Sequence, residues 1–182
     1  MQKRVPKNMR VLLIACMLLL LQQIKSQSLS FPQSFVGNWK GVLQLYKAGK
    51  DTVQSVAMEL RVQAIGTTPG QYTWNLIYGK PTEDNRPYLL KPVNITKGHW
   101  IIDEINGIVL DQYWMANRFT GVFAVQGTTI VNSYWIENEE LHIEFISFST
   151  KPRVTTGGNS AEIPPVDSYD TRGYQKAVLK KQ

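Results

Sequence analysis

The sequence predicts an all-β fold, an antiparallel up-and-down β-barrel of about ten strands. Apolar and polar residues alternate with a period of two through most of residues 35–181, which is the pattern of half-buried strands. Turn-forming residues recur at roughly 8–12-residue intervals, and no segment after residue 26 shows the period of a helix. Meander connections favour a barrel over a sandwich, because closure removes the exposed edges of so many apolar strands.

The first 26 residues have the pattern of a secretory signal peptide. Four basic residues precede an unbroken apolar run over 11–21, and polar residues follow. The run is shorter than the roughly 20 residues that a spanning helix needs. We therefore expect export to the periplasm or the exterior and a single barrel domain over residues 27–182. We expect no stable membrane insertion after cleavage, and an uncleaved anchor is the alternative.

The only cysteine, Cys16, lies inside this leader. Leu13-Ile14-Ala15-Cys16 looks like the lipobox of a bacterial lipoprotein, but the apolar run continues to Leu21, whereas a lipobox cysteine should end it. We expect Cys16 to belong to the signal, with lipidation as the alternative. Without this residue the remaining chain has no disulfide.

The charge of the chain is mostly a property of the leader. The formal net charge is +6, from 20 basic and 14 acidic residues, and five of the basic residues fall within residues 1–26. The rest of the chain carries 15 basic against 14 acidic residues, or +1. The usual inference from a basic protein to a nucleic-acid partner therefore fails.

Ten strands are expected after the leader. They cover residues 39–46, 52–64, 71–78, 88–96, 99–104, 108–115, 118–125, 128–136, 141–148 and 173–181. Residues 79–87 read as a polar loop, and Pro92 predicts an edge or a bulge because proline cannot donate to a ladder. Residues 149–172 are aperiodic and rich in Pro, Gly and Thr, which predicts a long irregular loop that is a lid, a passive connection or disordered.

Gly37-Asn38-Trp39-Lys40-Gly41 opens the first strand. It resembles the Gly-x-Trp(-x-Gly) signature of calycin-type barrels, which include lipocalins, fatty-acid-binding proteins and nitrobindin-like haem proteins. The chain is also similar to an exported lipocalin-like family of Bacteroidetes-type bacteria. The resemblance implies that Trp39 plugs the closed end, that Gly37 and Gly41 allow close approach, and that a later basic residue covers the tryptophan. Arg172, Lys176, Lys180 and Lys181 are the candidates for that residue.

The resemblance also implies a ligand inside the barrel. Aromatic and polar residues on apolar-looking strand faces form the candidate binding set: Trp74, Tyr78, Gln112, Trp114, Arg118, Asn132, Tyr134 and His142. An inward Arg118 would suit a carboxylate on an apolar ligand, because guanidinium binds carboxylate bidentately. We expect a small apolar or amphipathic molecule as the partner and no cofactor. The alternative is that these aromatics simply fill the core and Arg118 faces solvent.

Two other functions stay open at this point. A nitrobindin-like haem protein, or an enzyme, would use His142 facing inward beside Glu144, whereas an outward His142 would be an ordinary surface residue. A filled barrel could instead serve as a structural or protein-interaction module. No nucleophile motif, phosphate loop or dinucleotide-binding glycine pattern occurs, and two histidines without a cysteine outside the leader disfavour a transition-metal site.

Overall fold

The computed structural model describes residues 30–182, and residues 31–182 form one compact unit. The predicted signal peptide and Cys16 lie outside the described residues. Twelve strands and two short 3₁₀ turns are present in the described chain. The strands are β1 (Gly37–Tyr46), β2 (Gln54–Val62), β3 (Tyr72–Tyr78), β4 (Asp84–Asn94), β5 (His99–Asp103), β6 (Val109–Met115), β7 (Arg118–Val125), β8 (Thr128–Glu137), β9 (Glu140–Ser149), β10 (Val154–Thr156), β11 (Val166–Ser168) and β12 (Thr171–Lys181). The 3₁₀ turns are η1 (Gln33–Phe35) and η2 (Ile95–Lys97).

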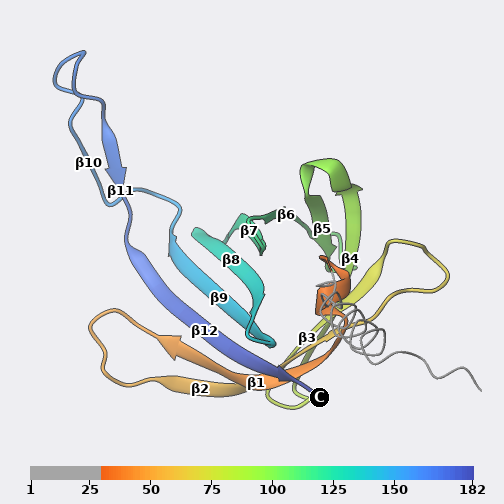
Figure 1. The fold of residues 1–182 in the computed structure, drawn as a ribbon. Helices are drawn as coiled ribbons and strands as arrows, with labels where there is room; N and C mark the ends of the chain where they lie inside the picture. The colour runs from red at the N-terminus through yellow and green to blue at the C-terminus, as the bar shows by residue number, and fades with distance from the viewer. Residues whose placement is uncertain (1–29) are drawn as a thin grey trace, which may run out of the picture. The chain divides into compact units, whose positions relative to one another are not determined.

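Ten of the strands form a closed antiparallel barrel (Figure 1), which confirms the predicted fold class. Strands β1 to β9 follow one another as an up-and-down meander, and β12 closes the barrel between β9 and β1. Closure pairs every barrel strand on both edges, so the barrel exposes no unpaired ladder. Strands β10 and β11 stand apart as a two-stranded sheet that extends away from the barrel (Figure 1).

Two segments differ from the sequence prediction. The expected irregular loop 149–172 contains the hairpin β10–β11, in which Val154, Thr155 and Thr156 pair with Ser168, Asp167 and Val166. The expected polar loop 79–87 ends early, because β4 already begins at Asp84. The predicted bulge at Pro92 is present, since the register between β4 and β5 shifts between Pro92 and Asn94.

The strand directions define two ends of the barrel. We call the end from which the hairpin β10–β11 leaves the open end, and the opposite end, where η1 enters, the closed end. Phe31 precedes η1 and Phe35 is its last residue, and both pack into an aromatic cluster there. Phe31 stacks on Trp114 and Phe119 at ring-centroid distances of 4.6 Å, and Phe35 lies 6.0 Å from Trp74. The segment before β1 is therefore part of the core.

Trp39 holds that segment in place. Its indole Nε1 donates a hydrogen bond of 2.8 Å to the backbone carbonyl of Phe35, and its side chain is buried. The Lys181 ammonium lies 5.3 Å from the centre of the Trp39 ring, a cation–π contact. Of the four basic residues considered from sequence, Lys181 is thus the one that covers the tryptophan.

The two glycines of the opening motif make room for β12. A Cβ on Gly37 would collide with the Lys181 side chain, and Gly37 has a φ of +142°, which side chains rarely adopt. A Cβ on Gly41 would collide with the Val178 carbonyl oxygen and the Leu179 side chain. The motif is therefore structural: it seats the last strand and its lysine against the first strand.

Candidate ligand-binding site

The inner face of the barrel divides into a fully buried half and a partly exposed half. In the closed half, Trp39, Trp74, Phe119 and Tyr134 are buried and pack on one another and on η1. Towards the open end, several inward apolar side chains pack against this core yet are only half-buried. These are Leu45, Val56, Tyr78, Tyr88, Leu110 and Phe145. These partly exposed inward side chains form an apolar surface at the open end of the barrel, and we call this surface the cup.

An ion pair stands at the rim of this cup. Asp84 and Arg86 face inward on β4, opposite Tyr78 and Leu76 of β3. Arg86 donates two hydrogen bonds to Asp84, from Nε to Oδ1 and from Nη2 to Oδ2, each 2.8 Å long. The guanidinium carbon lies 4.7 Å from the centre of the Tyr78 ring. These bonds lower the pKa of Asp84 and raise that of Arg86, so the pair stays ionised.

The tyrosines beneath the ion pair are held neutral. Burial raises the pKa of the Tyr78 hydroxyl, and the nearby Tyr134 adds to this effect. Burial also raises the pKa of Tyr88, whose hydroxyl lies close to Glu104 and Arg86. The wall of the cup near Arg86 therefore presents aromatic surface with uncharged hydroxyl groups.

The floor of the cup holds polar atoms without partners. Neither amide atom of Gln112, nor Oδ1 of Asn132, nor Nε1 of Trp74 has a hydrogen-bond partner, and all are sealed from solvent. Gln112 is 0% exposed and Asn132 is 3% exposed. A buried polar group without a partner costs about 1–3 kcal/mol, so this cluster is an expensive feature of the free barrel. We call Trp74 Nε1, Gln112 and Asn132 the polar cluster.

Five of the residues predicted from sequence meet at or near this floor. Gln112, Asn132, Trp74 and Tyr134 lie inside the barrel, with Trp74 and Tyr134 rings 5.1 Å apart. Tyr78 lies above them in the open half. Trp114 also faces inward, but at the closed end, where Phe31 stacks on it. Their part in ligand binding remains a prediction.

Of the two orientations considered for Arg118, the structure shows the one that faces solvent and not the inward one that a carboxylate ligand would need. Met115 pairs with Arg118 and Trp114 with Phe119 across a two-residue turn, so Phe119 takes the inward position and Arg118 the outward one. The Arg118 guanidinium instead lies 3.9 Å from the centre of the Trp135 ring on the outer face. The rim arginine of the cup is Arg86.

His142 also lies on the outer face. It pairs with Trp135 across β8 and β9, and the two rings stack at 5.1 Å, while its neighbours Leu141 and Ile143 are the buried residues. The haem and enzyme interpretations required this histidine inside the barrel, and the register excludes it from the interior. His99 faces outward too, where it bonds Asp111 at 2.6 Å and stacks on Tyr113.

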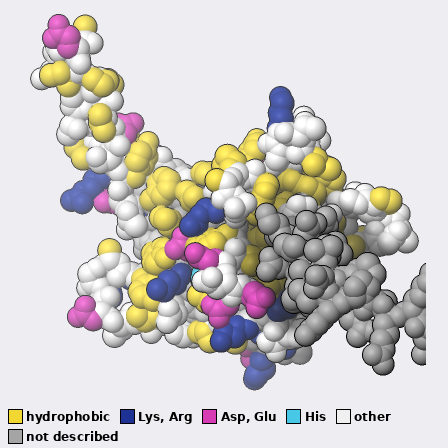
Figure 2. All heavy atoms as spheres, viewed as in Figure 1, with side chains coloured by type: hydrophobic (Ala, Val, Ile, Leu, Met, Phe, Trp, Pro, Cys, Tyr) yellow, Lys and Arg dark blue, Asp and Glu magenta, His cyan; other side chains and the backbone are white. Residues whose placement is uncertain are grey.

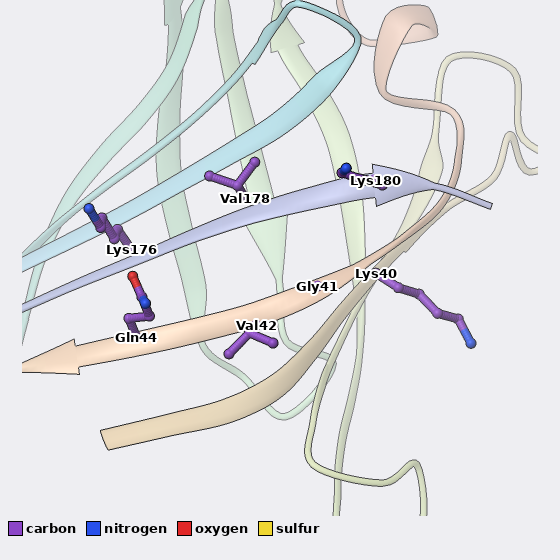
Figure 3. Close-up of a pocket in the computed structure, with 7 residues that line it drawn as sticks. All are labelled: Lys40, Gly41, Val42, Gln44, Lys176, Val178 and Lys180. Atoms are coloured by element: carbon purple, nitrogen blue, oxygen red, sulfur yellow. The ribbon is translucent and has the colours of Figure 1, made fainter. Parts of the chain in front are cut away.

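A groove lies outside the barrel, on β1 and β12. Figure 3 shows this groove of about 340 Å³, whose floor is formed by Gly41, Val42 and Val178 and whose margin carries lysines. Lys40 lies 3.1 Å from Glu59, and Lys180 lies 3.6 Å from Glu140. Because two of the three lysines that line the groove already pair with acids, the groove offers a weaker anion site than its composition suggests.

Within residues 30–182, no group of three or more His, Cys, Asp or Glu side chains could hold a metal ion. The same residues include no helix with the length and apolar character needed to cross a membrane.

The barrel is similar to a solved structure of unknown function. A DUF3598-family protein from Nostoc punctiforme superposes on 81% of this chain with a TM-score of 0.57 and 8% sequence identity. The likeness is one of fold. This chain covers 47% of that protein, about half its length. No protein-family model matches the sequence, and no curated protein matches it.

Proposed function

We propose that this protein is an exported, calycin-type binding protein whose open half holds a small apolar or amphipathic molecule without transforming it. The observation that carries the proposal is the half-buried inner face formed by Leu45, Val56, Tyr78, Tyr88, Leu110 and Phe145. Ligand sites are typically concave and apolar with a few polar groups that set orientation. The open half has this composition, and the filled closed half supplies a rigid base.

The leader and the opening motif support the compartment and the family in this proposal. The leader has the charged, apolar and polar regions of a signal peptide. Trp39 with Lys181 over its ring matches the arrangement that the lipocalin resemblance implies. Export is tested by expressing the full chain and determining the N-terminal residue of the protein recovered outside the cytoplasm; a product that still starts at Met1 would contradict cleavage.

A pair of neighbouring substitutions tests the site. Leu110 faces into the cup and is half-buried, whereas Val109, its neighbour on β6, is 51% exposed on the outer face. Leu110→Trp should fill the cup and weaken binding of the neutral dye N-phenyl-1-naphthylamine by about tenfold or more. Val109→Trp should leave dye binding unchanged. Equal binding by both variants, or no binding by the unmodified protein, would contradict the proposal.

Native mass spectrometry of the protein as isolated complements the dye assay. A bound small molecule should be released when the protein is denatured, and Leu110→Trp should carry less of it than Val109→Trp. The same amount in both variants would place the molecule outside the cup.

One observation favours protein interaction as a second function. The hairpin β10–β11 and its flanks expose Val154, Ile163, Val166 and Tyr169, each at least 44% accessible. Figure 2 shows hydrophobic side chains along this arm. An isolated two-stranded hairpin is only marginally stable in water. Replacing Val154, Ile163 and Val166 by serine should abolish any concentration-dependent self-association seen by analytical ultracentrifugation; a monomeric parent protein would remove self-association as the role.

A further inference from the structure

The polar cluster at the floor of the cup is unusual among buried polar groups. Buried side-chain polar atoms nearly always have a hydrogen-bond partner, and each exception calls for a cause. Here four atoms lack one: both amide atoms of Gln112, Oδ1 of Asn132 and Nε1 of Trp74. An apolar side chain of similar shape at each position would avoid the cost of burying them.

These atoms come together from three strands. Gly121 of β7 is paired with Gln112 on one side and Asn132 on the other. The Tyr134 hydroxyl lies near both Asn132 and Trp74, and burial raises its pKa to about 12 against the lowering effect of those two side chains. The polar cluster is therefore one local group, completed by a neutral tyrosine.

The polar cluster lies one step below the surface of the cup. On β6, Gln112 is the inward residue next to the half-buried Leu110. On β8, Asn132 is the inward residue next to the half-buried Ile130. A molecule that occupies the open half would have the polar cluster at its inner end.

The donors and acceptors of the polar cluster are all uncharged. Gln112 Nε2 and Trp74 Nε1 can donate, whereas Gln112 Oε1 and Asn132 Oδ1 can accept. Among inward positions of the described strands, charge occurs at Asp84 and Arg86, which pair with each other, and at Lys181, which covers Trp39 at the closed end. A carboxylate at the floor would be buried without a counter-charge, which is strongly unfavourable.

We propose that the polar cluster binds an uncharged hydrogen-bonding end of the ligand, such as a carboxamide, carbonyl or hydroxyl group, so that the ligand lies with this end inward. The inference rests on the proposed function and specifies its ligand class. A carboxamide satisfies the polar cluster best, because it offers donors to the free oxygens and an acceptor to the free N–H groups. A fatty acid bound by its carboxylate at the floor is the wrong ligand class for this site.

Binding in this manner requires the Gln112 side chain to move. In the free protein its amide lies against Gly121, where an added Cβ would collide with it. The glutamine side chain is long and rotatable, so it can turn from Gly121 towards a polar group arriving from the open half. Asn132 and Trp74 lie beside Tyr134, and their unpartnered atoms are also sealed in the free protein, so they would contact a ligand only after the polar cluster opens.

The test compares two probes of equal length, decanamide and decanoate, at pH 8, where the acid is ionised. Each probe competes with N-phenyl-1-naphthylamine for the full-length protein. The concentration of decanamide that displaces the dye should be at most about one tenth of the concentration of decanoate that does so. The Gln112→Leu and Asn132→Leu variants should still bind the dye. In each variant the ratio of the two displacing concentrations should fall to about one.

The outcomes separate the two proposals. Failure of the unmodified protein to bind the dye overturns both. Dye binding with equal displacement by both probes, or a preference that survives both leucine variants, overturns the inference and leaves the proposed function standing. Urea unfolding of the leucine variants provides the folding control: both should be at least as stable as the parent protein, because each removes unpartnered polar atoms. If one leucine variant fails to fold, the probe preference of the other variant still tests the inference.

Discussion

The two halves of the barrel interior are built differently from the same alternating strands. In the closed half, Phe35, Trp74 and Phe119 are fully buried, and Phe31 enters from outside the barrel to pack against them. In the open half, inward residues such as Tyr88 and Leu110 are only half-buried, and no element covers them within the described chain. The difference shows that the same alternating sequence pattern can produce a fully buried core in one half and a partly exposed apolar surface in the other.

The two halves should differ most in the stability lost when an inward aromatic residue is replaced. Replacing Trp39, in the closed half, by alanine should lower the free energy of unfolding by about 3–5 kcal/mol. It removes a buried ring, the hydrogen bond to Phe35 and the contact with Lys181. Replacing Tyr78, in the open half, by alanine should cost only about 1–2 kcal/mol, because the Tyr78 side chain keeps part of its surface exposed even though burial raises the pKa of its hydroxyl. Urea unfolding measures both, and equal losses would contradict the division into halves.

The pH dependence of stability tests whether Tyr134 is buried in its neutral form between the two halves. Tyr134 has a pKa of about 12, raised by burial above its usual value. A tyrosine is neutral below its pKa, so its contribution to stability is complete below about pH 10 and is lost as the pH rises towards 12. The loss attributable to Tyr134 should reach about 2–3 kcal/mol, since one pKa unit corresponds to about 1.4 kcal/mol.

The control for that titration is Tyr134→Phe, which retains the ring and removes the ionisable hydroxyl. Urea unfolding at several pH values from 8 to the alkaline limit should show a shallower decline for this variant than for the parent protein. Tyr174, which burial and Glu144 also shift to about 12, should supply part of the decline that remains. Identical declines in the two proteins would show that Tyr134 is not buried in its neutral form.

The smallest expected effect lies at the rim. Arg86→Gln removes the ion pair with Asp84, whose side chains are 46% and 40% exposed. Exposed ion pairs contribute about 0–1 kcal/mol, so the free energy of unfolding should change by less than that. Loss of more than about 2 kcal/mol would mean that the rim is part of the core. Because Arg86 lowers the pKa of Asp84, the small contribution of the pair should be lost as the pH falls through that lowered pKa.

The fold was accessible from sequence because strand alternation and turn spacing extend over most of the chain. The Gly37-Asn38-Trp39-Lys40-Gly41 motif correctly indicated the first strand and the closed end. Several lysines near the end of the chain were candidates for the residue over Trp39. The register between β1 and β12 was needed to identify Lys181 among them.

The site was harder to predict, because side-chain direction depends on turn length. The two-residue turn Ala116–Asn117 changes the inward positions from even numbers on β6 to odd numbers on β7, and this places Arg118 outside. The turn Asn138–Glu139 does the same for His142 on β9. Neither turn contains glycine, although all four residues have positive φ, so the sequence offered weak evidence of their length.

Arg86 and Asp84 were missed for a different reason. Their segment is polar and is interrupted by Pro87, which suggested a loop. A signal was nevertheless present, because Asp84, Arg86, Tyr88 and Leu90 alternate with the correct period and all face inward. Gln112 and Asn132 were identified as candidates on the parity of their strands, but their lack of partners is visible only in the packed structure.

Closure of the barrel joins residues that are far apart in the chain. Trp39 pairs with Lys181, and β12 supplies the second neighbour of both β1 and β9. Contacts between distant residues form slowly, because the entropy of closing the intervening loop must be lost before the contacts are gained. We therefore expect the meander β1–β9 to assemble first as an open sheet, with an unpaired β1 edge that is prone to misassembly until β12 arrives. The rate of folding should accordingly be set by the last strand to join, and the Lys181–Trp39 contact reports when that step is complete.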